Sequence, residues 1–161
     1  MEKEQECCVK FNPKKWDGKT FHWKEKKFIK EDIHTFFHIP LPSSINKKVT
    51  NMCKLSEDAK TVSAKKDEVL LLFRDPSAFN SEIYLSVTKN VPGANNVKIS
   101  GTFVAKVYSG GYNAVPKFIK QLNEYLAKEN KKAKDYYVHY AYCPKCANKY
   151  GDNYMIIFAE I

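Results

Sequence analysis

Arginine is almost missing from this sequence: Arg74 is the single one among 27 basic residues, and the rest are lysines. The basic residues outnumber 18 acidic ones and give a net charge of +9 at neutral pH. Proteins that read nucleic acids usually depend on arginine for bidentate contacts to phosphate and guanine. Lysine charge alone is more typical of a solvated surface, so no specific nucleic-acid partner is expected.

Long apolar runs are also missing. No stretch approaches the ~20 apolar residues needed to cross a bilayer, and the N-terminus MEKEQECC is charged where a signal peptide would be apolar. The five cysteines are an odd number, and their spacing does not suggest the disulfide framework of a secreted protein. We therefore expect a cytoplasmic protein with reduced thiols and no membrane span.

The common catalytic signatures are absent as well. The sequence holds no GxSxG motif, no Walker loop and no Rossmann glycine fingerprint, so acyl transfer from a nucleophile elbow and nucleotide chemistry lose their usual support. The four histidines are scattered and form no metal-binding spacing. No cofactor is expected, and a metal-independent hydrolase on this chain would have to use Glu and Tyr as acid and base.

The clearest positive signal is the segment Ser100–Leu126, which predicts a strand, a glycine turn and an amphipathic helix. Residues 102–108 alternate between two sides, as a strand between two environments does. Gly110 and Gly111 follow as a turn. From Asn113, a suitable N-cap, apolar residues recur with the i, i+3, i+4, i+7 spacing of a helix with one buried face.

The same order of parts occurs 67 positions earlier, at residues 35–59, with Pro42, Ser43 and Ser44 in place of the glycine turn. Two extended runs follow each helix: 68–73 and 82–87, then 136–142 and 154–161. The predicted fold is therefore α+β, a duplicated strand-helix-strand-strand unit with pseudo-twofold symmetry. We expect an antiparallel sheet with two long helices on one face and a ligand cleft between the units.

Residues 1–30 stand outside this repeat and carry aromatic residues spaced among lysines. They predict an N-terminal arm packed on a single domain of residues 31–161, in which the repeats cover about 33–90 and 98–161. Thr20–Phe28 reads as an added strand. The alternative is a surface for single-stranded nucleic acid, on which Trp16 and Trp23 would stack bases.

The segment KVYSGGYNAVPKFIKQLNEYL resembles the strand, G-x-Y turn and helix of the GyrI-like (gyrase-inhibitor-like) small-molecule-binding domains. The likeness covers roughly residues 30–161. The pieces CCVKFNPKKWD, FFHIPLP and YCPKCANKYGDNYMIIFAEI are similar to a stand-alone subgroup often labelled hydrolase. The resemblance implies an aromatic-lined cleft that holds lipophilic compounds, cations among them, against a buried acidic residue.

Two glutamates lie on predicted strands that suit this role and are the candidate catalytic residues. Glu82 heads the strand EIYLSV, and Glu160 lies near the end of the apolar strand MIIFAEI. A carboxylate among aromatic rings attracts cations, and the ring faces add to that attraction. The alternative is that both glutamates lie at strand ends in water. The aromatic residues predicted to bind the ligand are Trp23, Tyr84, Tyr112, Tyr140 and Phe158.

These features predict a stand-alone protein that binds small lipophilic aromatic compounds, cationic ones among them. One alternative is a hydrolase that attacks a strained or reactive lipophilic compound in the same cleft. A second alternative is a lysine-rich binder of nucleic acid or of an anionic surface. The sequence names neither the ligand nor the oligomeric state.

The motif Cys143-Pro-Lys-Cys146 has the spacing of half a zinc site or of a redox pair. A four-cysteine site would need Cys7 and Cys8, which are adjacent in the chain. A thioredoxin-type helix after the motif is missing. A reduced turn, a zinc site and a redox pair therefore all stay open, and no metal is predicted.

Overall fold

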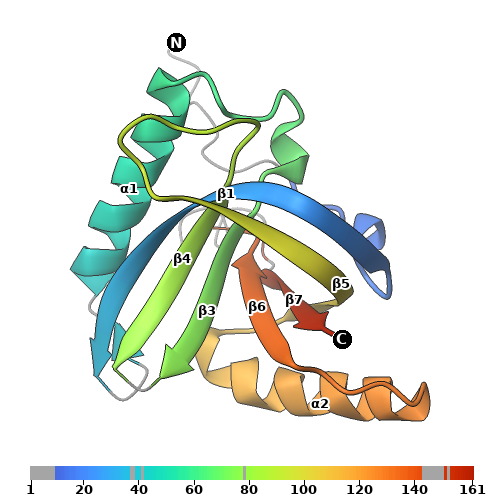
Figure 1. Ribbon diagram of the computed structural model, residues 1–161. Helices are drawn as coiled ribbons and strands as arrows, with labels where there is room; N and C mark the ends of the chain where they lie inside the picture. Colours follow the sequence, from blue (N-terminus) through green and yellow to red (C-terminus); the bar gives the residue numbers. More distant parts are fainter. Residues whose placement is uncertain (1–9, 37–38, 41, 78, 143–150, 152) are drawn as a thin grey trace. The chain divides into compact units, whose positions relative to one another are not determined.

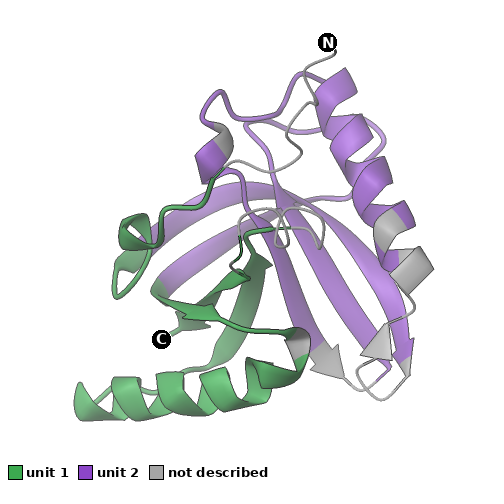
Figure 2. Ribbon diagram, turned by 180° about the vertical axis from the view of Figure 1, so that it is seen from behind, with its two compact units in different colours: residues 1–21, 103–161 green, residues 22–102 purple. Residues whose placement is uncertain are grey.

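The computed structural model describes residues 10–36, 39–40, 42–77, 79–142, 151 and 153–161. The chain divides into two compact units (Figure 2). Unit 1 comprises Met1–Phe21 and Phe103–Ile161, and unit 2 comprises His22–Thr102. Each unit contains one long helix and its own antiparallel strands (Figure 1).

In chain order the elements are η1 (Pro13–Lys15), β1 (Thr20–Phe36), β2 (Ile39–Pro40), α1 (Pro42–Asp58), η2 (Lys66–Glu68), β3 (Leu71–Ser77), β4 (Asn80–Ser86), β5 (Asn96–Ser109), η3 (Tyr112–Ala114), α2 (Val115–Lys128), β6 (Asp135–Tyr140) and β7 (Tyr154–Glu160). The α+β class, with antiparallel strands and two long helices, is confirmed. The duplication, its pseudo-twofold symmetry and the cleft stay predictions. Within the described residues, no helix has both the length and the apolar character needed to cross a bilayer.

In unit 2 the strands follow the order β2-β1-β4-β3, and every pair is antiparallel. Helix α1 covers one face of these strands. The buried residues of that layer are Ile29, Ile33, Met52, Ile83, Leu85 and Val91. Because side chains alternate along a strand, the residues between them on β1 and β4 point to the opposite face. That opposite face carries Lys30, Glu82 and Tyr84.

Helix α1 begins at Pro42, whereas the sequence suggested a turn at residues 42–44 before the helix. Proline is tolerated in a first helical turn because its missing N–H has no partner there in any case. After the helix ends at Asp58, Lys60 adopts a positive φ of 53°. The amide of Thr61 then donates to the carbonyl of Ser56 at 2.9 Å, which closes the helix end.

Strand β1 is longer than the sequence suggested. It joins the predicted strand Thr20–Phe28 to the start of the predicted first repeat in one element that ends at Phe36. A local irregularity interrupts it at Glu25, which has a φ of 48° and donates its amide to the Ser100 hydroxyl at 2.8 Å. An irregularity of this kind leaves no signature in a pattern of apolar residues.

In unit 1 the strands follow the order β6-β7-β5, again antiparallel. Helix α2 packs its predicted inner residues Phe118, Leu122 and Leu126 on one face of these strands. The helix begins at Val115, after the short turn η3, and its N-cap is Ala114 without a side-chain bond. The sequence had suggested Asn113 as the cap.

Residues 10–21 pack on the strands of unit 1. Gly18 and Lys19 exchange backbone hydrogen bonds with Ala105 at 2.9 Å. Trp16 is 7% exposed, and its ring meets the ring of Phe158 edge-on at 6.0 Å. Asp17 accepts a hydrogen bond from the amide of Val107 at 3.0 Å. Backbone pairing, ring packing and a carboxylate contact thus hold this segment in place.

Candidate functional site

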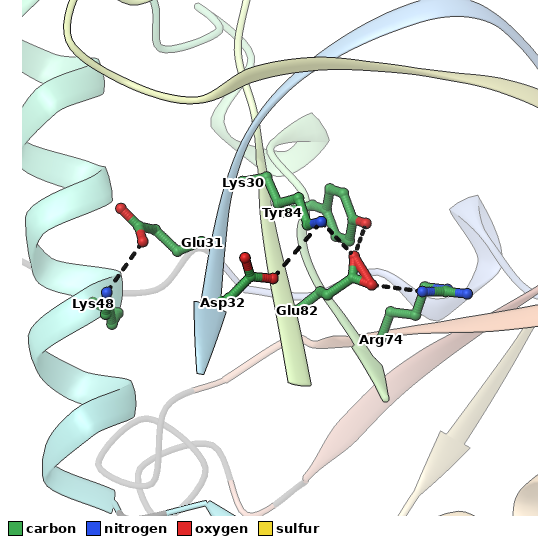
Figure 3. Close-up of polar contacts among 7 residues, drawn as sticks. All are labelled: Lys30, Glu31, Asp32, Lys48, Arg74, Glu82 and Tyr84. Atoms are coloured by element: carbon green, nitrogen blue, oxygen red, sulfur yellow. Dashed lines mark hydrogen bonds and ion pairs between the residues drawn. The ribbon is translucent and has the colours of Figure 1, made fainter. Parts of the chain in front are cut away.

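Strand β4 places Glu82 in the middle strand of three, on the face of unit 2 opposite α1. The register puts Asp32 of β1 on one side of Glu82 and Arg74 of β3 on the other. Paired residues of antiparallel strands share a face, so these three side chains form one row. The next row contains Lys30, Tyr84 and Leu72. On the α1 side of β1, Lys48 of the helix pairs instead with Glu31 at 3.2 Å (Figure 3).

Three donors surround the Glu82 carboxylate (Figure 3). Arg74 donates from Nη1 to Oε1 at 2.6 Å, and the Lys30 ammonium lies 3.0 Å from Oε2. The Tyr84 hydroxyl donates to the same Oε2 in a short hydrogen bond. The Glu82 side chain is only 9% exposed. A carboxylate can remain ionised at such a depth only if charge and hydrogen bonds compensate it, and here both do.

The balance of these effects favours the charged form. Burial raises the pKa of Glu82, but hydrogen bonds from Tyr84 and Lys30 and the charges of Lys30 and Arg74 outweigh burial, so the pKa is lowered overall. Glu82 is therefore ionised at neutral pH. Asp32 is a weaker member of the row, since it is 59% exposed and lies 3.7 Å from Lys30.

Aromatic rings continue from Tyr84 along the same side of the strands. The ring of Phe28, which is fully buried, meets that of Tyr84 edge-on at 6.2 Å and lies 6.0 Å from that of Trp23. The Lys26 ammonium lies 5.8 Å from the Trp23 ring centre, and burial lowers the pKa of Lys26 against an opposing effect of Glu68. We call the group of residues Trp23, Phe28, Lys30, Arg74, Glu82 and Tyr84 the Glu82 cluster.

The other residues that the sequence singled out lie in unit 1. Glu160 ends β7, is half-buried and shares a strand face with Phe158. Phe158 is fully buried and packs against Trp16 and Phe21. Tyr140 packs on the layer beneath α2. Tyr112 begins η3, and its side chain lies outside what the structure describes. The structure therefore brings Glu82, Tyr84 and Trp23 into one cluster.

Sequence reasoning missed Lys30 and Arg74. A signal for Arg74 was present, because the only arginine of the chain directly follows the predicted extended run 68–73. In the structure Arg74 lies on β3 and pairs with Glu82 in the register of β3 and β4. Lys30 carried no such signal, because lysines are common throughout the sequence.

Within the described residues, no group of three His, Cys, Asp or Glu side chains is arranged to hold a metal ion. The cysteines of the proposed zinc site, Cys7, Cys8, Cys143 and Cys146, lie outside the described residues. The zinc site, the redox pair and the reduced turn therefore all stay open. Cys53 packs on the layer beneath α1, and burial, with a contribution from Glu57, raises the pKa of its thiol.

Comparison with known proteins gives a family and a fold. The family model described as "Bacterial hydrolase" matches residues 1–161. Among curated proteins, none matches the sequence significantly. The solved structure of a hydrolase from Listeria innocua is 12% identical in sequence. Its superposition spans 90% of this chain and 92% of the hydrolase chain, with a TM-score of 0.63.

Two further solved structures share the fold. The C-terminal domain of EcmrR, at 12% identity, covers 88% of this chain and 94% of its own, with a TM-score of 0.65. SAV2435, solved bound to tetraphenylphosphonium, is 9% identical in sequence. Its superposition spans 88% of this chain and 92% of the SAV2435 chain, with a TM-score of 0.51. At identities this low, the structural similarity establishes a shared fold and no shared function.

Proposed function

The chain belongs to the bacterial hydrolase family, and from the Glu82 cluster we propose that it binds small lipophilic aromatic molecules. The observation that carries this proposal is a 9% exposed, ionised carboxylate held by three donors next to aromatic rings. Binding sites for small molecules combine apolar and aromatic walls with a few placed polar groups, and the cluster has this composition.

The energetic cost of the cluster supports a role beyond folding. Burying an ion pair is expensive, and apolar residues of similar volume are often equally or more stabilising at such positions. The face of β4 opposite α1 nevertheless carries Glu82 and Tyr84 rather than aliphatic residues. Titratable groups with perturbed pKa values, gathered on a buried face, are candidates for a functional site.

The relatives support the same proposal. SAV2435 was solved with tetraphenylphosphonium, a bulky lipophilic aromatic cation, and the EcmrR C-terminal domain shares the fold. The family name and the Listeria innocua neighbour introduce hydrolysis as the second candidate. The resemblance to GyrI-like domains is compatible with both candidates and stays a prediction.

A thermal-shift experiment tests the binding proposal. A ligand that binds only the folded chain stabilises it by about 2.7 kcal/mol at a hundredfold excess over its Kd. We expect some members of a panel of cationic, neutral and anionic lipophilic aromatics to raise the melting temperature. Trp23→Leu should reduce that rise, because Trp23 supplies a half-buried ring beside Phe28.

Tyr125→Leu is the matched control, since Tyr125 is a half-buried aromatic residue on α2, in the other unit. Its ligand response should equal that of the unmodified protein. If no compound of any charge shifts the melting temperature, the binding proposal is wrong.

The pairing of Glu82 with the Tyr84 hydroxyl is the observation that favours the hydrolase candidate. An ionised Glu82 could act as a base toward water, with an ester or a strained ring as substrate. Glu82→Gln should then lower turnover by about 10²–10⁴-fold and leave the binding of an uncharged substrate largely intact, because only proton transfer is lost. Glu160→Gln is the parallel test of the second carboxylate. Turnover that persists unchanged in both variants would remove the carboxylate mechanism.

A further inference from the structure

The polar part of the Glu82 cluster presents its cations to solvent more than its carboxylate. The side chains of Lys30 and Arg74 are 25% and 28% exposed, whereas that of Glu82 is 9% exposed. The side chains that carry the two cations are therefore more open to solvent than the side chain that carries the carboxylate.

The charges around Glu82, on the face of unit 2 opposite α1, also favour an anionic ligand. Both carboxylate oxygens of Glu82 are engaged, Oε1 by Arg74 at 2.6 Å and Oε2 by Lys30 at 3.0 Å. One negative charge thus faces two positive ones. Asp32 adds a negative charge, but it is 59% exposed and 3.7 Å from Lys30, so water screens most of its effect. Lys26 lies beside Trp23 and Phe28, where Glu68 offsets part of its charge.

A lipophilic cation would have to displace a cation already bound to Glu82. Lys30 and Arg74 are tethered to neighbouring strands, so their effective concentration at the carboxylate is high. An anion competes with Glu82 itself for Lys30 and Arg74, but an ammonium has three N–H donors and a guanidinium has five, so both groups can bind a second acceptor while they hold Glu82. The excess positive charge at the carboxylate favours that second acceptor. Guanidinium also offers planar donors that suit carboxylate, sulfonate and phosphate groups.

We propose that the Glu82 cluster recognises an aromatic compound by an anionic group, which Lys30 and Arg74 bind. Glu82 is then a positioning residue: it holds two cations close together that would otherwise repel each other. Tyr84, hydrogen-bonded to Glu82, extends this arrangement toward Phe28 and Trp23, which would contact the aromatic part of the ligand. This assignment rests on the proposed binding function and specifies its ligand class.

Two probes of the same shape and opposite charge test whether the Glu82 cluster prefers an anionic or a cationic ligand. Tetraphenylborate and tetraphenylphosphonium would each be titrated calorimetrically into the full chain. A second pair, 2-naphthoate and 2-naphthylmethylammonium, adds a localised charge that can form hydrogen bonds. We expect the anion of each pair to bind at least about tenfold more tightly, because opposite charges at contact distance are strongly favoured at a partly buried site.

Variants of the cluster should change this preference in opposite directions. Lys30→Gln should weaken binding of 2-naphthoate and strengthen binding of 2-naphthylmethylammonium, because it leaves Glu82 with a single cation. Glu82→Gln should do the reverse, because it leaves both cations without their carboxylate. Lys30 is a quarter exposed, so its substitution should be tolerated by the fold even if that of Arg74 is not.

Lys132→Gln is the control for the general charge of +9, since Lys132 is an exposed lysine after α2 in unit 1. It should leave both affinities unchanged.

Tighter binding of the cations, lost in Glu82→Gln, would overturn the assignment, as would equal binding of both charges in every variant. Binding of neutral aromatics alone would overturn it too and leave the proposed binding function standing, whereas a failure of every compound to bind would refute that function itself.

Discussion

Glu82 links the stability of unit 2 to pH. Its pKa is lowered on folding, by hydrogen bonds and charges that outweigh burial. Its contribution to the free energy of unfolding is therefore complete at pH values above the unfolded pKa, about 4.3. That contribution is lost as the pH falls through the lower pKa of the folded state.

Glu82→Gln should consequently lower the free energy of unfolding by about 1–3 kcal/mol at pH 7, because the two cations lose a charged acceptor. The loss should be smaller at pH 3, which lies below the unfolded pKa, because the unfolded chain then binds a proton that the native carboxylate resists. Urea unfolding curves at the two pH values measure both quantities. Glu129→Gln, which affects an exposed pair with Lys131 at 3.2 Å, is the control. An equal loss at both pH values would contradict the assigned direction of the pKa shift.

At the level of single residues, the sequence allowed the carboxylate to be predicted but not its partners. Glu82 stood out because it opens a strand of alternating apolar and polar residues. Its contacts with Lys30 and Arg74 depend on which residues of β1 and β3 lie opposite it, and register is a long-range property of the folded sheet. The two glutamate candidates looked alike in sequence, and only Glu82 has a described set of charged partners.

At the level of elements, helix α2 was the most predictable part of the chain, because its apolar spacing is local information. Its inner residues Phe118, Leu122 and Leu126 are buried as expected. The start of α1 and the continuity of β1 were not predictable. Pro42 reads equally well as a turn or as a first helical residue, and the irregularity at Glu25 has no compositional signal.

The turn before α2 depends on glycine at position 110, which has no side chain. A Cβ built at Gly110 would lie 2.9 Å from the Phe118 ring, which is 8% exposed and stacks on Tyr108 with ring centres 4.7 Å apart. Gly110→Ala should therefore lower the free energy of unfolding by about 1–3 kcal/mol, the usual cost of overpacking a core. Chemical denaturation measures this change.

A double-mutant cycle supplies the control for this prediction. Phe118→Leu removes the ring and destabilises the core on its own account. If the Cβ–ring contact is the cause, Gly110→Ala should cost less in the Phe118→Leu background than in the unmodified protein. Strict additivity of the two changes would show that the cost has another origin.

At the level of the whole molecule, the charge of +9 raises the question of nucleic-acid binding. Trp16, one of the two tryptophans that would stack bases, is buried against Phe21 and Phe158. We therefore expect only weak association with single strands, with an affinity that falls steeply as salt releases counterions. Fluorescence anisotropy at two salt concentrations measures this. Tight binding at physiological salt that is lost in Trp23→Ala would reverse the ranking of the functions.

The α+β class followed from the sequence because each helix and each strand has its own period of apolar residues. The boundary between the two units could not be predicted from the sequence. Both β1 and β5 pass from one unit to the other, at Phe21–His22 and Thr102–Phe103, so a unit boundary lies inside a strand rather than in a linker. Composition marks linkers, but it does not mark a boundary of this kind.

The positions of the two tryptophans give the molecule an intrinsic fluorescent reporter in each unit. Trp16 belongs to unit 1 and lies against Phe158, while Trp23 belongs to unit 2 and lies beside the Lys26 ammonium. Replacing either one with phenylalanine leaves a single indole whose emission follows one unit alone. Coincident transitions in the two single-tryptophan proteins would identify one cooperative folding unit, and separated transitions would assign each unit its own stability. The same emission from Trp23 would report ligand arrival at the Glu82 cluster without any added dye.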